Sequence, residues 1–410
     1  MKNCIVAQSG GPTVAINASL AGVISGVLNS SEYDIVYGSL NGITGILDDR
    51  LLNLSEIFAE GKPMLDKLVM TPAMYLGSCR YKLPKREADP AIYESIFRFF
   101  EEKEIAAFFY IGGNDSMDTV DKLSAYAEEI GSPIRIIGIP KTIDNDLCVT
   151  DHTPGFGSAA KYVASTFLEI AHDTFIYKVK SVTIVEVMGR DAGWLTAASV
   201  LARNGYNAAP HLIYLPECAF DTQEFLEDVK ELLSKQHNVI VAVSEGIRDK
   251  DGKYISASSS TVDNFGHSQL SGAGKTLEYF LKDNLDVKVR SIELNVLQRC
   301  ASHIASKTDL EESFNLGEKA VELAAEGKNA VMLTIERTSN APYAVTYGCS
   351  PVCDIANKAK DVPHHFINER GNDLTNEVIE YLRPLVQGEM PIPYENGLPA
   401  YLPVDHLLDQ

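Results

Sequence analysis

The sequence predicts an α/β protein with two doubly wound, Rossmann-like domains, each built on a parallel sheet. Three observations lead to this fold class: short apolar runs of strand length, glycine or proline turns after most of them, and helical stretches after those turns. Strands that are apolar throughout and alternate with helices are typical of parallel sheets covered on both faces. The pattern occurs in each half of the chain, so two such domains are expected.

In the first half, four apolar runs are predicted as strands. The first, residues 4–8, leads through a Ser-Gly-Gly-Pro turn to a helix predicted from about residue 15 to 28. The other three are residues 34–38, 106–111 and 134–139, with a helix ending near residue 129 before the last of them. Glycine and proline close most of these runs, as expected where a strand gives way to a turn.

The second half repeats the alternation. Predicted strands lie at residues 182–187, 212–215 and 239–243, and helices begin at about residue 192 and cover 222–235. The tail after about residue 363 is less regular and contains four prolines after residue 390, so we expect it to wrap the surface.

No low-complexity linker marks a domain boundary. We expect one domain to comprise residues 1–150 plus about 300–350, and the other to comprise 151–299 plus about 351–410. Ligands of open α/β sheets bind at the carboxyl ends of the strands. The active site is therefore expected in the cleft between the two domains.

Composition favours a cytoplasmic enzyme. Of 410 residues, 45% are apolar and 22% are charged, and 56 acidic against 36 basic side chains give a formal charge of −20. A chain this acidic is poorly suited to bind nucleic acid or an anionic membrane, and its apolar runs are shorter than the ~20 residues of a membrane span. The seven cysteines are scattered without zinc-site spacing, which favours reduced thiols.

Two glycine-containing turns could cradle a phosphate. The Ser-Gly-Gly turn at residues 9–11 follows the first strand, and glycines let the backbone approach a phosphate beside a helix N-terminus. The turn at residues 112–116 repeats the device, but Asp115 places a carboxylate where a phosphate loop avoids one unless a cation mediates. The alternative is that both are structural turns, with Asp115 or Ser116 capping the helix.

The segment Lys141-Thr142-Ile143-Asp144-Asn145-Asp146 is the most informative in the chain. In an extended stretch, two carboxylates two residues apart point to the same side and can divide the roles of base and metal ligand. Lys141 adds a point charge for phosphate. The alternative is a solvated acidic turn, which the apolar strand before it disfavours.

Arginines offer further anion contacts. Arg190 stands at the end of a predicted strand and could grip a phosphate through two N–H groups, or simply pair with Asp191. Four basic residues, Arg80, Lys82, Lys85 and Arg86, fall within seven positions and would suit a small anionic ligand. The alternative there is a solvated loop.

Together and in this order, these segments resemble the phosphofructokinase superfamily over residues 4 to about 335. The most specific piece is the run at residues 142–146, supported by Met188-Gly189-Arg190 and Gln298-Arg299. The resemblance implies that Asp144 is the catalytic base, with Asp146 beside it near the metal. It also implies that Gly11 contacts the phosphoryl donor and Arg80 the transferring phosphate.

The resemblance also assigns a fructose 6-phosphate site and a cofactor. Arg190 would lie close to the transferred group, and Mg²⁺ is the implied cofactor, with Asn114 standing where many relatives have an aspartate ligand. Arg290 would be offered by a neighbouring subunit of a homodimer or homotetramer. The residues implied to bind the sugar phosphate are Thr142, Ile143, Met188, Gly189, Glu245 and Arg299.

Two positions bear on the donor. Pyrophosphate-using members resemble this chain in having Asp and Lys at the positions of Asp115 and Lys141, where ATP users have glycines. A side chain at 115 occupies space that a nucleotide α-phosphate needs, and its charge repels that phosphate. The implied reaction is reversible transfer from pyrophosphate to the 1-hydroxyl of fructose 6-phosphate. The alternatives are an ATP-dependent kinase of fructose 6-phosphate or sedoheptulose 7-phosphate, a non-catalytic regulatory subunit, and an NAD or lipid kinase.

Overall fold

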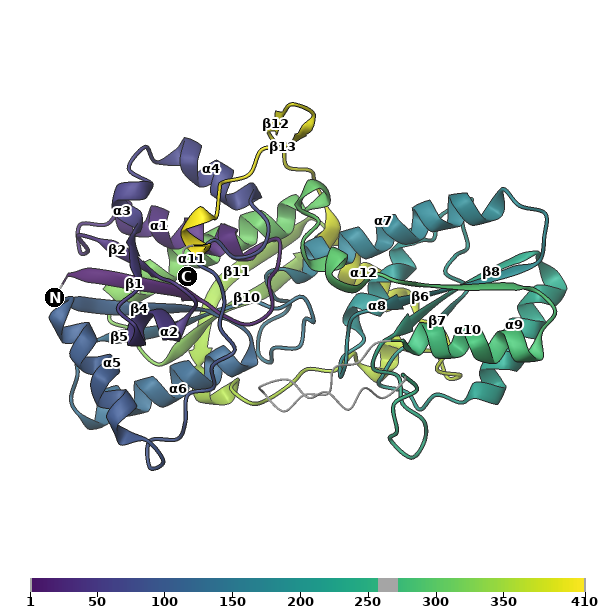
Figure 1. Ribbon diagram of the computed structural model, residues 1–410, viewed down its shortest axis with the longest axis horizontal. Helices are drawn as coiled ribbons and strands as arrows, with labels where there is room; N and C mark the ends of the chain where they lie inside the picture. The colour runs from purple at the N-terminus through teal and green to yellow at the C-terminus, as the bar shows by residue number, and fades with distance from the viewer. Residues whose placement is uncertain (1, 257–271, 409–410) are drawn as a thin grey trace.

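Two separate β-sheets organise the computed structural model, which describes residues 2–256 and 272–408. Figure 1 shows them in the left and right halves of an elongated molecule. The strands of the larger sheet are β1 (Asn3–Gln8), β2 (Val36–Ser39), β3 (Leu51–Asn53), β4 (Ile105–Gly112), β5 (Arg135–Pro140), β10 (Val331–Asn340) and β11 (Tyr343–Pro351). Their order is β11-β10-β5-β4-β1-β2-β3, with parallel pairing from β2 to β10 and antiparallel strands at both edges.

Helices cover both faces of this sheet. They are α1 (Ile16–Leu28), α2 (Ile43–Leu47), α3 (Leu54–Ile57), α4 (Lys62–Met70), α5 (Pro90–Glu102), α6 (Asn114–Glu129) and α11 (Lys307–Ala325). Helices α1 and α11 pack closely because glycines meet at their contact. A Cβ on Gly22 would lie 2.0 Å from the Phe314 carbonyl oxygen, and one on Gly317 would lie 2.2 Å from that of Ser19. No larger side chain fits at either position.

The smaller sheet is entirely parallel. Its strands are β6 (Ser181–Val187), β7 (Leu212–Tyr214), β8 (Asn238–Ser244) and β9 (Lys288–Glu293), in the order β7-β8-β6-β9. The helices around it are α7 (Phe156–Phe175), α8 (Trp194–Ala198), α9 (Thr222–Lys235), α10 (Ala273–Asn284) and α12 (Asn376–Leu382). Apolar clusters fill the space on both faces of the sheet.

The predicted fold class is confirmed, and every predicted strand is present within two residues of its expected ends. The sequence did not predict β3, β9, the antiparallel hairpin β10–β11 or the helices α2–α5, α7 and α10–α12. In this hairpin, β10 begins with a short buried run at residues 332–335, but exposed and half-buried residues alternate beyond Ile335, so most of the hairpin has no continuous apolar run. Across the described residues, no helix is long and apolar enough to cross a membrane.

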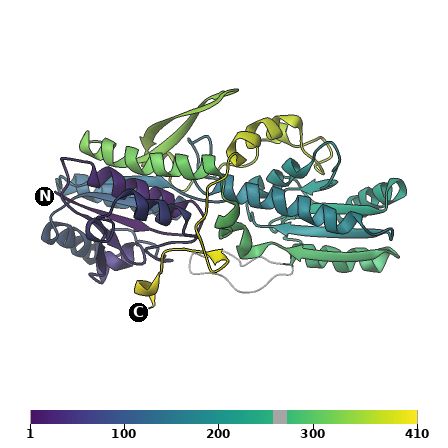
Figure 2. The same cartoon turned by 90° about the horizontal axis from the view of Figure 1, so that it is seen from above.

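The C-terminal tail packs on both halves of the molecule. Val352 and Ile355 join the core beneath α6, and residues 362–386 join the core of the smaller sheet. The chain then returns, and Leu402 and Leu407 pack with the core around α1. Figure 2 shows this yellow segment passing from α12 across the molecule to the C-terminus. The start and the last part of the tail therefore pack with the larger sheet, and the expected domain division stays a prediction.

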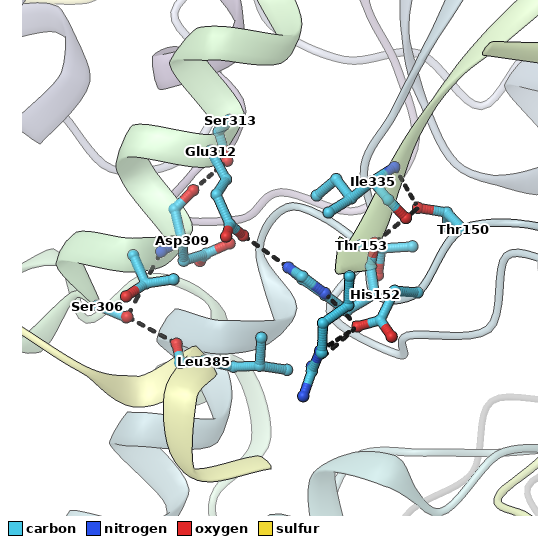
Figure 3. A network of polar contacts seen from close by, with 12 residues as sticks. Thr150, His152, Thr153, Ser306, Asp309, Glu312, Ser313, Ile335 and Leu385 are labelled. Atoms are coloured by element: carbon cyan, nitrogen blue, oxygen red, sulfur yellow. Dashed lines mark hydrogen bonds and ion pairs between the residues drawn. The ribbon is translucent and has the colours of Figure 1, made fainter. Parts of the chain in front are cut away.

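A buried histidine ties α11 to the segment that leads into α7 (Figure 3). His152 is 2% exposed, and its Nδ1 lies 2.7 Å from Asp151 Oδ1 while its Nε2 lies 2.6 Å from Glu312 Oε2. Arg337 Nη2 also lies 2.8 Å from Asp151 Oδ1. Burial alone would lower the pKa of His152, but hydrogen bonds and charge from the two carboxylates outweigh it and raise the pKa.

This arrangement predicts a pH-dependent stability. A histidine whose pKa is raised on folding adds stability that is fully present below its unfolded pKa of about 6.5 and is lost as pH rises through the folded value. Replacing His152 by Gln should therefore cost more unfolding free energy at pH 6 than at pH 9, by about 1.5–3 kcal/mol for a lost charge-assisted bond. Urea unfolding of both proteins at the two pH values measures this, and an equal cost at both would contradict it.

Candidate active site

The candidate site begins where three neighbouring strands of the larger sheet end. Because β1, β4 and β5 are adjacent and parallel, the turns after them meet at one edge. Ser116 Oγ donates to Ser9 Oγ at 3.0 Å, and Lys141 N donates to the Gly112 carbonyl at 2.9 Å. Gly10 has a φ of +82°, and a Cβ there would lie 3.2 Å from Lys141 Nζ. The predicted phosphate turns and the acidic segment therefore form one cluster.

Lys141 lies at the centre of this cluster and is 2% exposed. Its Nζ donates to the Gly11 carbonyl at 2.7 Å. The pKa of Lys141 is lowered to about 8. Burial and the charge of Arg299 lower this pKa more than the charges of Asp144 and Asp146 raise it. The ammonium is thus held between the first turn and two carboxylates.

The two carboxylates are both half-buried. The pKa of Asp144 is raised to about 7. Burial and the charge of Asp146 raise this pKa more than Lys141 and Arg190 lower it. Burial also raises the pKa of Asp146, while Lys141 and Lys360 lower it. A carboxylate with a pKa near neutrality is well suited to accept and release a proton.

The backbone of this acidic turn differs from the prediction. An extended stretch was expected to direct both carboxylates to one side, but Asn145 has a φ of +54° in the left-handed region. That expectation is wrong, and the turn is instead held by hydrogen bonds. Thr142 Oγ1 accepts from Asp144 N at 3.1 Å, and Thr153 Oγ1 donates to the Thr142 carbonyl at 2.9 Å.

The smaller sheet contributes the ends of β6 and β8. Glu245 Oε1 accepts from Gly189 N at 3.2 Å, and Glu245 N donates to the Val187 carbonyl at 3.0 Å. A Cβ on Gly246 would lie 1.8 Å from the Arg190 carbonyl oxygen, so only glycine lets these two turns interlock. The pKa of Glu245 is raised to about 7. Burial and the charge of Asp144 raise this pKa more than Arg190 lowers it. Electrostatic coupling thus links the turns of the two sheets.

Three arginines lie near these turns. Arg299, at the end of the 3₁₀ helix η2 (Asn295–Arg299), has its Nη1 3.6 Å from where a Cβ on Gly11 would stand. Arg80 is exposed and follows Ser78, whose hydroxyl donates to the Gly10 carbonyl at 2.7 Å. Arg190 has a buried Nε without a hydrogen-bond partner among the described residues. The alternative that Arg190 pairs with Asp191 is not what the structure shows, because Asp191 pairs with Arg248.

Arg290 lies outside this cluster. It stands opposite Thr183, four residues before the end of β6, and forms an ion pair with Asp173 at 3.0 Å. It also donates to Thr183 Oγ1 at 3.1 Å. Within one chain it is therefore directed away from the turns that form the site.

Asn114 and Asp115 lie in the first turn of α6, beside the cluster. Asn114 Nδ2 donates to the Lys358 carbonyl at 2.6 Å, and its Oδ1 accepts from Asn357 N at 2.6 Å. Both side-chain atoms are therefore used to bind the tail. This disfavours Asn114 as a metal ligand, because its one ligand atom already accepts a hydrogen bond.

The chain matches a known protein family. The family model described as "Phosphofructokinase" matches residues 3–324, more than three quarters of the chain. The chain belongs to the phosphofructokinase family. Proteins named pyrophosphate–fructose 6-phosphate 1-phosphotransferase are similar to it: that of Halomonas elongata is 44% identical over 97% of this chain and 94% of its own. That of Xanthomonas campestris is 42% identical over 98% and 95%.

Solved structures agree with this assignment. The pyrophosphate-dependent phosphofructokinase of Nitrosospira multiformis superimposes with a TM-score of 0.88 at 40% identity, over 98% of this chain and 96% of its own. The phosphofructokinase of Saccharomyces cerevisiae, at 19% identity and a TM-score of 0.67, shares the fold.

Some residues around this phosphofructokinase site gave no signal in the sequence. Lys360 N donates to the Asp146 carbonyl at 2.7 Å, and Lys360 Nζ donates to the carbonyls of Thr150 and Asp151 at 3.1 and 2.8 Å. Burial lowers the pKa of Lys360 to about 8. Lys360 is far from the acidic turn in the sequence and has no motif around it, so only the folded chain shows this contact.

Proposed function

We propose that the chain transfers a phosphoryl group from pyrophosphate to the 1-hydroxyl of fructose 6-phosphate. The products are fructose 1,6-bisphosphate and phosphate, and the reaction runs in both directions. The observation that carries this proposal is the buried Lys141 ammonium, 2.7 Å from the Gly11 carbonyl and in the electrostatic field of Asp144 and Asp146. The relatives with 40–44% identity over nearly the whole chain, which bear that enzyme name, support it.

The donor side favours a compact, highly charged phosphate. Lys141 can stabilise the concentrated charge of pyrophosphate, and the open backbone at Gly10 and Gly11 lets phosphate oxygens approach. Asp115, in the first turn of α6, would occupy space that a nucleotide α-phosphate needs, as the resemblance implies. This combination supports pyrophosphate over ATP.

The proposed mechanism uses Asp144 as the general base. Asp144 accepts the proton of the sugar 1-hydroxyl while that oxygen attacks the nearer phosphorus of pyrophosphate in line. Lys141, Arg190 and Arg80 stabilise the charge that spreads over the phosphoryl oxygens, which is the main task of a phosphoryl-transfer site. In the reverse direction, Asp144 returns the proton.

The carboxylates also fit a magnesium ion that arrives with the donor. Among the described residues, no three or more His, Cys, Asp or Glu side chains gather to hold a metal by themselves. Mg²⁺ commonly binds one or two carboxylates plus substrate phosphates and water, and Asp146 would hold it here. When bound, Mg²⁺ offsets the negative charge of the pyrophosphate oxygens.

The sugar phosphate is proposed to lie between the turns of the two sheets. Glu245 would accept a sugar hydroxyl, and Arg299 would bind the 6-phosphate. Arg290, directed away from its own site, would serve that of a neighbouring subunit in a homodimer or homotetramer. The remaining proposed contacts come from the turns after β5 and β6: Thr142, Ile143, Met188 and Gly189.

A donor-competition assay tests the proposal. Initial rates of the purified chain are measured with pyrophosphate and with ATP, at saturating fructose 6-phosphate and Mg²⁺. We expect turnover with pyrophosphate and little with ATP. A preference for ATP would transfer the assignment to an ATP-dependent kinase, and no turnover with either donor would favour a regulatory subunit.

A further inference from the structure

A tyrosine from the tail holds the residue between the two acidic side chains. Asn145 is completely buried, and its Nδ2 donates to the Tyr381 hydroxyl oxygen at 2.9 Å. The Tyr381 hydroxyl in turn donates to the Asp151 carbonyl at 2.8 Å. On the other side, Thr153 N donates to Asn145 Oδ1 at 3.1 Å. Both polar ends of the Asn145 side chain are thus fixed.

The Tyr381 ring is held firmly enough to act as a support. Its centroid lies 5.2 Å from that of Trp194 and 6.0 Å from that of Phe366. The Arg337 guanidinium stands 4.6 Å from the same centroid, and Arg337 Nη1 donates to the Tyr381 carbonyl at 2.9 Å. Burial raises the pKa of Tyr381, so its hydroxyl stays protonated and can donate to Asp151.

The support matters because of the backbone that it holds. Asn145 has a φ of +54°, in the left-handed region that asparagine adopts more readily than most residues, and bonds at both ends of its side chain hold it there. It stands directly between Asp144 and Asp146, so a change in its φ would move both carboxylates. A displacement of about 1 Å in a reacting group can cost 10²-fold in rate.

We propose that Tyr381 is a positioning residue of the phosphoryl-transfer site, acting through Asn145 to fix the acidic turn. Its hydroxyl bonds are made to the Asn145 side chain and the Asp151 carbonyl, and not to the carboxylates of Asp144 or Asp146. The inference rests on the proposed function, because it assumes that Asp144 and Asp146 carry the reaction.

The test compares Tyr381→Phe with Tyr343→Phe. The first removes the hydroxyl bonds to Asn145 and to the Asp151 carbonyl and leaves the ring in place. We expect its kcat to fall roughly 10- to 100-fold, with KM for both substrates nearly unchanged. The control Tyr343 also stands beside Arg337 and donates a buried bond, to Glu312 Oε1 at 2.7 Å, but it does not reach Asn145. It should lose thermal stability and keep its kcat.

Two outcomes would overturn the proposal. Either Tyr381→Phe keeps the wild-type kcat, or both variants lose kcat in proportion to their loss of Tm, which is the result of a purely structural role. A double-mutant cycle with Asn145→Ala adds a second criterion. If Tyr381 acts through Asn145, the double variant should be no slower than Asn145→Ala alone, and independent, multiplying losses would contradict this.

The cycle also keeps the proposal testable if Tyr381→Phe does not fold. Asn145→Ala breaks the same bond from the other side, and a wild-type kcat in that variant would overturn the proposal. All rates are measured with whichever donor the wild type turns over. Failure of wild type with pyrophosphate therefore refutes the proposed donor, while a wild-type rate in Tyr381→Phe refutes only the role of Tyr381.

Discussion

Replacing Asp144 by Asn should lower kcat by roughly 10²–10⁴-fold, the usual contribution of a general base, while KM for both substrates changes little. The amide has nearly the same shape but cannot accept the proton of the sugar hydroxyl. Because Asp144 is half-buried and desolvation opposes its charge, the neutral amide should not destabilise the fold. Steady-state kinetics in both directions and a thermal melt measure these effects.

A neighbouring carboxylate provides the control. Asp191 is exposed, pairs with Arg248, and its charge raises the pKa of Asp144 without sharing its place in the acidic turn. Asp191→Asn should keep a kcat close to that of the wild type. A near-normal kcat in Asp144→Asn would remove Asp144 from the mechanism.

The second large effect concerns the donor. Changing both Asp115 and Lys141 to glycine should reduce the pyrophosphate-dependent kcat by ~10²–10³-fold, as expected when a preorganised charge-stabilising donor is lost. ATP-dependent turnover should appear, because the double change removes the side chain and charge at 115 that stand against an α-phosphate. Rates with each donor at saturating fructose 6-phosphate measure the change.

The single variants divide this effect. Asp115→Gly alone should lower the rate with pyrophosphate and allow some turnover with ATP. Adding Lys141→Gly to Asp115→Gly should raise the ratio of the ATP rate to the pyrophosphate rate further, whereas Lys141→Gly alone should not raise it. Lys141→Gly also leaves the Gly11 carbonyl without its partner, so a lower Tm is expected. An unchanged ratio of donor rates in Asp115→Gly would show that Asp115 does not select the donor.

The sequence predicted the part of the site that depends on strand ends. The turns at residues 9–11, 112–116 and 140–146 each follow an apolar run, and parallel pairing then requires them to meet. Lys141 and Asp144 could be identified in this way before any coordinates. The same reasoning placed Arg190 at the end of a strand in the second sheet, whereas Glu245 came only from the family resemblance.

Other features depend on contacts that local sequence does not encode. Asn145 and Tyr381 are separated by 236 positions, and neither has a pattern that announces the bond. The left-handed φ of Asn145 is held by hydrogen bonds with Tyr381 and Thr153. Because these bonds cannot be seen in the local sequence, the sequence predicted an extended turn. Asn114 was considered as a metal ligand because of the family resemblance. Its hydrogen bond to the Lys358 carbonyl could not be predicted, because no periodicity in the sequence revealed how the tail packs.

The order of strands in the larger sheet has a consequence for synthesis on the ribosome. All four strands of the smaller sheet lie between residues 181 and 293, so they emerge in one stretch. The larger sheet by then has only five of its seven strands, because β10 and β11 come after residue 330. Until they emerge, β5 is an unpaired edge of apolar residues, the kind of edge that invites pairing with another chain. The nascent chain therefore has most need of chaperone protection late in translation, at the half that was made first.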